Sequence, residues 1–224
     1  YVADVSRILS DISGTTAARF GVPFALSYLA MSDPRRADGL MNGEVFEMTM
    51  ERLTGVPVSD ATIADALDYY DAEVLPRRNT ALVAARPMPG GTDAIERVGA
   101  LGLRCALATN PSFSEGCIRA RMGWANIADA PFERVSHMGN STRLKPRSRY
   151  YEEFIGSLGL LPEECLMVGN DAKRDFPKPD IGLRVAYVGH ARPRRAVWSG
   201  RMSELADALP ALVDRLNVED EARA

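Results

Sequence analysis

The stretch MVGNDAKRDF, residues 167–176, is an apolar run that ends in a glycine, an asparagine and two aspartates. Its first residues have the composition of a buried strand, and Asp171 and Asp175 follow directly after the end of that strand. Burying a charge without a partner is costly. The two carboxylates are therefore either ordinary first-turn acids, which a helix dipole favours, or ligands of a cation.

The bulk composition is that of an ordinary globular protein. The chain has 224 residues, of which 46% are apolar and 25% charged, and its net charge is −3. This length allows one large domain or two smaller ones with a sizeable core. A nucleic-acid-binding surface needs a basic excess, and a membrane span needs about 18 consecutive apolar residues, so we expect neither partner. Three cysteines without paired spacing indicate a reducing, cytoplasmic environment.

The two parts of the chain differ in their hydrophobic periodicity. Residues 1–85 have a helical pattern throughout, and Gly55 marks the end of one helix. From residue 86 onward, predicted strands alternate with predicted helices. The strands are expected at 103–110, 132–138, 165–171 and 183–190. This alternation predicts an α/β fold of three layers, in which helices cover both faces of a parallel sheet, preceded by an all-helical domain over residues 1–85.

Polar residues follow three successive predicted strands. In chain order they are Thr109, Asn110, Lys145, Asn170, Asp171 and Asp175. In parallel sheets the ligand crevice lies outside the carboxyl ends of the strands, so we expect these side chains to share one site. Taken singly, each has a simpler interpretation: Thr109 as a helix cap, Lys145 as a surface lysine, and the two aspartates as first-turn acids.

Such a set of residues suits phosphoryl transfer, where catalysis is positioning and electrostatic stabilisation. Lys145 would neutralise phosphate as a point charge, while Thr109 and Asn110 would bind phosphate oxygens by hydrogen bonds. Carboxylate and carbonyl oxygens together with water suit Mg²⁺. We therefore expect Asp171 and Asn170 to hold Mg²⁺. Asp175 is either a further ligand or an anchor for Lys145.

Three of these segments resemble the motifs of the haloacid dehalogenase superfamily, most of whose members are phosphatases. The segment ALATN, which contains Thr109, resembles the second motif, LKP with Lys145 the third, and MVGNDAKRDF the acidic fourth. The similarity extends over about residues 86–190. It implies a Rossmann-like core domain over residues 86–224, a helical cap domain over residues 1–85, and Mg²⁺-dependent hydrolysis of a small phosphorylated substrate.

The sequence departs from the pattern of that superfamily in two places. The first motif of the superfamily is Asp-x-Asp on the first core strand, and its first Asp is the nucleophile that forms an aspartyl-phosphate. No such pair precedes the helical part here, so we expect that strand and its aspartates to lie upstream of Tyr1. The second departure is Asn170, where the superfamily often has an acid. Asn170 adds no charge, which makes Asp171 the expected main metal ligand.

Three functions are compatible with the sequence. The leading one is a Mg²⁺-dependent phosphatase. A 2-haloacid dehalogenase would use a similar nucleophile without a metal, but the acidic residues would repel its carboxylate substrate. The third is a catalytically dead member of the fold that binds a phosphorylated ligand or a protein, which the missing first motif would favour.

Overall fold

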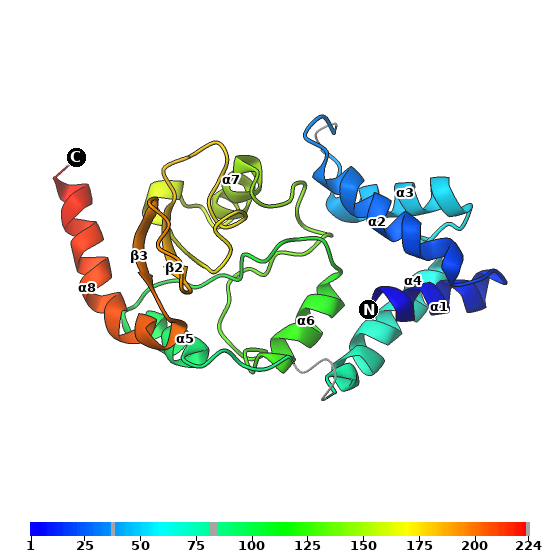
Figure 1. The fold of residues 1–224 in the computed structure, drawn as a ribbon, viewed down its shortest axis with the longest axis horizontal. Coiled ribbons are helices and arrows are strands. Elements are labelled where there is room, and N and C mark those ends of the chain that lie inside the picture. Colours follow the sequence, from blue (N-terminus) through cyan, green and yellow to red (C-terminus); the bar gives the residue numbers. More distant parts are fainter. Residues whose placement is uncertain (37–38, 81–84, 223–224) are drawn as a thin grey trace. The chain divides into compact units, whose positions relative to one another are not determined.

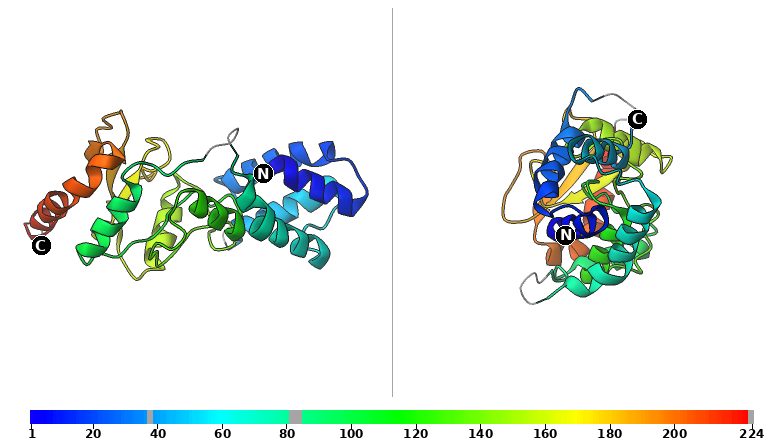
Figure 2. Two further views of the ribbon diagram at one scale, coloured as in Figure 1. Left: turned by 90° about the horizontal axis from the view of Figure 1, so that it is seen from below. Right: turned by 90° about the vertical axis from the view of Figure 1, so that its right-hand side faces the viewer.

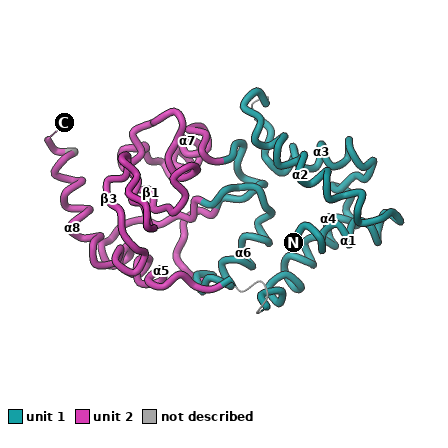
Figure 3. The backbone as a smooth tube through the Cα atoms, in the orientation of Figure 1, with its two compact units in different colours: residues 1–85, 109–128, 136–144 teal, residues 86–108, 129–135, 145–224 magenta. Residues whose placement is uncertain are grey.

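A computed structural model of the chain describes residues 1–36, 39–80 and 85–222. The chain divides into two compact units (Figure 3). Unit 1 comprises residues 1–85, 109–128 and 136–144, and unit 2 comprises residues 86–108, 129–135 and 145–224. The predicted helical domain over residues 1–85 therefore falls within unit 1, which also includes two segments from the predicted α/β domain.

Unit 1 is helical in its described residues. Its elements are α1 (Val2–Ser13), α2 (Ala18–Ser32), α3 (Asn42–Thr54), α4 (Ala61–Tyr69), the π-helical turn η1 (Tyr70–Val74), the 3-10 turn η2 (Leu75–Arg78) and α6 (Glu115–Trp124). Helix α3 ends where Gly55 takes the left-handed conformation with φ of 69°, as the sequence predicts. Helices α2 and α3 lie side by side (Figure 2).

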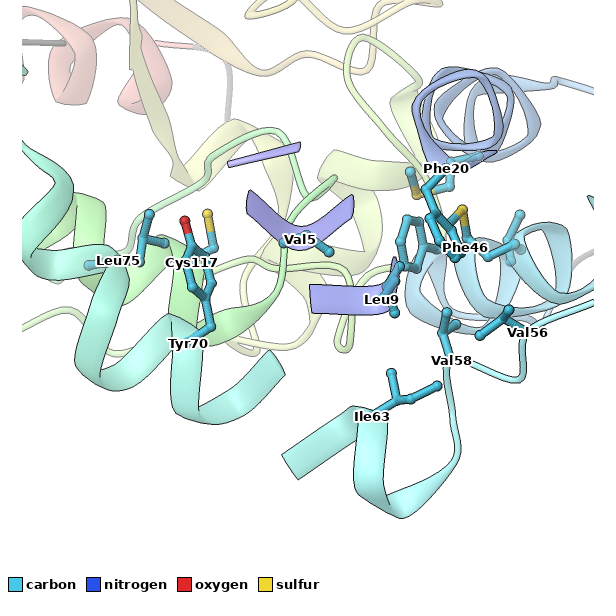
Figure 4. Close-up of a cluster of buried hydrophobic side chains, with 14 of the residues drawn as sticks. Val5, Leu9, Phe20, Phe46, Val56, Val58, Ile63, Tyr70, Leu75 and Cys117 are labelled. Atoms are coloured by element: carbon cyan, nitrogen blue, oxygen red, sulfur yellow. The ribbon is translucent and has the colours of Figure 1, made fainter. Parts of the chain in front are cut away.

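The core of unit 1 forms where the apolar faces of these helices meet. Leu9 of α1, Phe20 of α2 and Met50 of α3 are completely buried. Figure 4 shows this cluster, to which Ile63 of α4 and Cys117 of α6 also belong. Burial of each large apolar side chain contributes about 1.5–3 kcal/mol, so the helices are stabilised by packing more than by their intrinsic propensity.

Unit 2 has the predicted α/β architecture. Its elements are α5 (Gly91–Ala100), α7 (Ser148–Gly156), the 3-10 turn η3 (Pro162–Glu164), β1 (Leu166–Gly169), β2 (Arg184–Val188), β3 (Ala196–Gly200) and α8 (Met202–Glu221) (Figure 1). The three strands form a parallel sheet in the order β1-β2-β3. The strands are short, and apolar side chains alternate between the two faces.

Helices cover both faces of this sheet, which confirms the prediction of three layers. Val168 of β1 packs with Leu205 and Leu209 of α8 on one face. On the other face, Met167 of β1 packs with Tyr151 and other residues of α7. Helix α5 lies against α8 on the first face. Among the described residues, no helix is both long and apolar enough to cross a membrane.

The prediction of strands at 103–110 and 132–138 was wrong in the described structure. These segments share one isolated parallel bridge, between Leu107 and Val135, and the backbone N–H of Glu133 donates to the backbone oxygen of Cys105 at 2.9 Å. A regular β-ladder needs several successive residue pairs, which these segments do not form. On its other side, the segment 103–108 is separated from β1 by a groove of about 580 Å³. We call this the β1 groove. It is lined by Arg104, Cys105, Ala106 and Ala108 on one side and by Cys165, Leu166, Met167 and Val168 on the other.

Two further elements differ from the sequence-based expectation. Strand β3 was not predicted, because Ala196–Gly200 is short and follows an arginine-rich loop. Within the helical pattern expected over residues 1–85, the regular α-helix α4 ends at Tyr69, and the chain continues as the π-helical turn η1 and the 3-10 turn η2. Pro76 in η2 cannot donate a backbone hydrogen bond, so a regular α-helix cannot continue through it.

Candidate active site

A buried ion pair lies just beyond the carboxyl end of β1. The Nζ atom of Lys145 donates a hydrogen bond to Oδ1 of Asp175 over 2.8 Å. Only 5% of the Lys145 side chain and 8% of the Asp175 side chain are exposed. Because two charges in so dry a place are stable only when paired, the two side chains fix each other's positions.

Asp175 is held from a second direction as well. Its Oδ2 atom accepts a hydrogen bond from the backbone N–H of Asp171 at 2.8 Å. The carboxyl group crosses the end of β1 so closely that a Cβ atom on Gly169 would overlap it. A glycine is therefore required at the last residue of the strand. Both oxygens of Asp175 are engaged, which gives this residue the geometry of an anchor for Lys145 rather than of a metal ligand.

The surroundings of Lys145 are aromatic and only slightly hydrated. Its Nζ atom lies 5.9 Å from the ring centroid of Tyr150 and 5.8 Å from that of Tyr151. Burial lowers the pKa of the Lys145 ammonium, and the attraction of Asp175 opposes this effect. The hydroxyl of Tyr151 donates to the backbone oxygen of Arg174, which ties helix α7 to the loop after β1. The lysine is thus a positioned cation inside unit 2, not a mobile surface group.

Asp171 has a different environment from Asp175. Its side chain is 43% exposed, and Oδ1 accepts hydrogen bonds from the backbone N–H groups of Lys173 and Arg174 at 2.9 and 3.3 Å. These contacts fix the carboxylate at the start of the turn, while Oδ2 lies 3.8 Å from Nε of Arg174. Asn170 beside it is exposed. Asp171 and Asn170 can therefore both offer an oxygen atom to a cation from the solvent side.

Asp171 and Asn170 suit Mg²⁺ only if water and substrate oxygens complete its coordination. Across residues 1–36, 39–80 and 85–222, no three His, Cys, Asp or Glu side chains are grouped so that they could hold a metal. Mg²⁺ is usually bound through one or two carboxylates, several waters and substrate phosphate oxygens. The partly exposed carboxylate of Asp171 and the amide oxygen of Asn170 are compatible with such binding. They would not form a closed structural site.

Thr109 and Asn110 belong to unit 1 and are described with it. The backbone oxygen of Thr109 accepts a hydrogen bond from the buried Ser136 hydroxyl at 2.8 Å. The sequence prediction that Thr109 and Asn110 share a site with Lys145 stays a prediction. By contrast, Lys145, Asp171 and Asp175 are brought together within unit 2.

One structural residue near Thr109 was missed by sequence reasoning. Asn42, at the start of α3, is completely buried. Its Nδ2 donates to the backbone oxygens of Pro111 and Arg143 at 3.0 and 3.3 Å. Asn42 therefore holds the segment after Thr109 and the segment before Lys145 against the first turn of α3. An amide among apolar neighbours at a helix start carries no distinctive sequence signal.

A second missed residue is the buried carboxylate of Asp71 in η1, whose exposed fraction is 4%. Oδ2 accepts a hydrogen bond from the Ser114 hydroxyl, and the Tyr1 hydroxyl lies 3.5 Å away. Oδ1 is buried and has no hydrogen-bond partner among the described residues. Burial is the main cause that raises the pKa of Asp71. Its position eight residues after Ile63 and four after Leu67, on an apolar stripe, was the available signal.

Comparisons with known proteins identify the fold. No family model matches the chain, and no curated protein matches its sequence. An HAD phosphatase from Thermococcus onnurineus is similar in structure, with a TM-score of 0.50 and 17% identity, over 93% of this chain and 87% of that one. L-2-haloacid dehalogenase from Xanthobacter autotrophicus has a TM-score of 0.50 and 15% identity, over 94% of this chain and 93% of that one. A predicted phosphoglycolate phosphatase from Haemophilus somnus has a TM-score of 0.51 and 14% identity, over 93% of this chain and 90% of that one.

These structures include phosphatases and a dehalogenase, and their sequence identity to this chain is low. They therefore bear on the architecture and not on the reaction. The chain has the fold of the haloacid dehalogenase-type hydrolases.

Proposed function

We propose that the protein is a Mg²⁺-dependent phosphatase that hydrolyses a small phosphomonoester through an aspartyl-phosphate. The observation that carries the proposal is the buried Lys145–Asp175 pair at the carboxyl end of β1. An ammonium group is expensive to bury, and its aromatic surroundings keep it from moving. A cation fixed at this edge of a parallel sheet suits a ligand with a concentrated negative charge.

Under this proposal each residue has a separate task. Lys145 neutralises charge on the phosphoryl group and the nucleophile, and Asp175 keeps its ammonium group in place. Thr109 and Asn110 donate hydrogen bonds to phosphate oxygens. Asp171 and Asn170 hold Mg²⁺, which supplies charge neutralisation to the transferring group.

The division of labour between Asp171 and Asp175 supports the metal assignment. Asp175 has both oxygens occupied by Lys145 and the N–H of Asp171. Asp171 leaves a partly exposed carboxylate beside the exposed Asn170. One acid thus orients the lysine and the other remains accessible to an incoming cation.

The test is a hydrolysis screen on the natural polypeptide. Small phosphomonoesters and 2-chloropropionate are assayed with added Mg²⁺ and with EDTA. We expect phosphate release that EDTA removes and Mg²⁺ restores. Chloride release that EDTA does not change would replace the proposal with a haloacid dehalogenase. No turnover of either class, with phosphate still bound, would indicate a catalytically dead binding protein.

A further inference from the structure

Helix α2 is apolar on its exposed side as well as on its buried side. It packs against α1 and α3 within unit 1 (Figure 1). The residues that it buries there are Phe20, Pro23, Ser27 and Met31. The residues on the opposite side of the helix are exposed and include Ala18, Val22, Ala25, Leu26 and Leu29. We call these five exposed residues the α2 face.

The exposure of the α2 face is unusual for a helix at the surface. Val22 is 68% exposed, Leu29 61% and Leu26 41%. A surface helix normally carries charged residues on its outer side, and a helix that is apolar all round is normally buried. The neighbouring α3 follows the rule, with Glu51 and Arg52 at exposed positions. A contiguous exposed apolar stripe marks a surface that another molecule covers.

The spacing of residues along α2 makes its exposed side complementary to itself. Steps of four and three residues lead from Ala18 through Val22, Ala25 and Leu29 to Ser32, so these side chains form one stripe along the helix. Small and large side chains alternate along that stripe. When a two-fold axis relates two such helices in antiparallel orientation, large side chains of one can pack against small side chains of the other.

Charged residues at the two ends of α2 favour the antiparallel orientation. Arg19 and Asp33 are both exposed. Between these two residues the sequence contains no charge. An antiparallel pair of α2 helices brings Arg19 of one copy toward Asp33 of the other, whereas a parallel pair brings like charges together. The uncharged stretch and its oppositely charged ends therefore suit a second copy of the same helix.

We propose that the α2 face is a docking surface for a second copy of this chain, which it binds through α2 in antiparallel orientation, with Ala25 near the two-fold axis. A helix of 15 residues is only about 22 Å long. Its face is smaller than the about 800 Å² per partner that is typical of stable complexes. The dimer should therefore dissociate on dilution.

This inference concerns assembly and does not depend on the proposed phosphatase activity. A dimer without phosphatase activity would support the inference and count against the proposed function. An active phosphatase that stays monomeric would do the reverse.

The first test measures molecular mass against concentration. The natural polypeptide is studied by sedimentation velocity over about a hundredfold range of protein concentration. We expect the mass to double toward the upper end of this range. Val22→Glu should raise the dissociation constant at least about tenfold, because a charge then enters an apolar contact. Circular dichroism checks that this variant is folded, which we expect because Val22 is already 68% exposed.

The matched control for Val22→Glu is Val218→Glu. Val218 lies in another helix, α8, and is 64% exposed. This substitution introduces the same charge at a similar exposure, and it should leave the dissociation constant unchanged. A monomer at every concentration would overturn the inference. Equal dissociation constants for Val22→Glu and the unchanged protein would also overturn it, because the dimer would then use another surface.

Cysteine cross-linking tests the orientation. Two Ala25→Cys chains should form a disulfide-linked dimer when diamide is added, since residue 25 meets its counterpart near the axis. The two copies of residue 18 would be about 21 Å apart along the antiparallel pair, beyond the about 7 Å that a disulfide spans between Cα atoms, so Ala18→Cys should not cross-link. The unchanged chain, with Cys105, Cys117 and Cys165, is the control. Cross-linking through Ala18→Cys, or through neither variant, would overturn the proposed pairing.

Discussion

Breaking the Lys145–Asp175 pair leaves a charge in a nearly dry environment. We predict that Lys145→Met lowers the free energy of unfolding by about 3–5 kcal/mol, because the Asp175 carboxylate then lacks its counter-ion. Urea unfolding at neutral pH measures the change. The matched control is Arg149→Met, which removes an ion pair whose arginine side chain is 54% exposed and should cost less than about 1 kcal/mol.

A double-mutant cycle decides whether the pair acts as a unit. Lys145→Met combined with Asp175→Asn should cost clearly less than the sum of the two single changes, because the second change removes the isolated charge. If the two effects simply add, the Lys145–Asp175 contact contributes no coupling and the account of the fixed lysine fails.

Asp71 gives a pH-dependent prediction. Its pKa in the folded state is raised above the ordinary value of 3.8, so the native state holds the proton more tightly than the unfolded state. As pH rises through the interval between these two pKa values, the unfolded state loses its proton first and stability falls. We therefore compare the change in the free energy of unfolding that Asp71→Asn causes at two pH values. This change should be about 1 kcal/mol more favourable to the folded state at pH 7.5 than at pH 4.

The control for Asp71 is Asp65→Asn, which changes an exposed acid on α4. Stability curves of both variants against pH are compared with the unchanged chain. An Asp71→Asn curve parallel to that of the unchanged chain from pH 4 to 7.5 would show that Asp71 has the same pKa in both states.

Single residues also show how far a sequence can be interpreted. The acids after residue 169 were predicted as a pair from their position at a strand end. The sequence predicts Asp171 as the main metal ligand and leaves Asp175 open between a further ligand and an anchor for Lys145. The contacts that favour the anchor follow from the close passage of Asp175 over Gly169 and from Lys145, thirty residues away, and neither was predictable. Contacts of this kind depend on tertiary packing rather than on local pattern.

Among the elements, the helices were predicted better than the strands. Helices such as α1 and α7 have their own periodicity and end signals, so a local pattern suffices. A strand exists only when a neighbour pairs with it. The segments 103–110 and 132–138 have the right composition, but in the described structure they share one bridge, and the first of them borders the β1 groove.

The junction between α5 and α8 provides a test at the scale of elements. Gly90, the N-cap of α5, has φ of 84°, and a Cβ atom there would lie 2.8 Å from the backbone nitrogen of Ser203 in α8. We predict that Gly90→Ala lowers the free energy of unfolding by about 2 kcal/mol, because both the left-handed conformation and the close approach oppose a side chain. Thermal or urea unfolding measures it.

The neighbouring Gly91 is the matched control for Gly90. A Cβ atom on Gly91 would meet only the Cβ atom of Met88, at an ordinary 3.9 Å. Gly91→Ala lies in the first turn of α5 and should be neutral or slightly stabilising. If Gly90→Ala and Gly91→Ala lower the free energy of unfolding equally, the close contact between Gly90 and α8 does not explain the loss.

For the whole molecule, the order of chemical motifs along the chain predicted the fold, and the structural comparisons confirm it at low sequence identity. The division of the chain was harder to predict, since residues 109–128 and 136–144 are grouped with residues 1–85. Segments such as 109–128 follow a predicted strand in sequence, yet Asn42 and Ser114 connect them to helices of unit 1. Sequence periodicity carries no information about such long-range contacts.

The most direct measurement of the central claim is phosphatase activity of the natural polypeptide as a function of Mg²⁺ concentration. We predict that EDTA removes the activity, and that Asp171→Asn lowers kcat/KM by at least about 100-fold because the main metal carboxylate is lost. Asp180→Asn, an exposed acid in the same loop that pairs with Arg195, should leave kcat/KM unchanged. Full activity of Asp171→Asn, or activity that EDTA does not affect, would contradict the account.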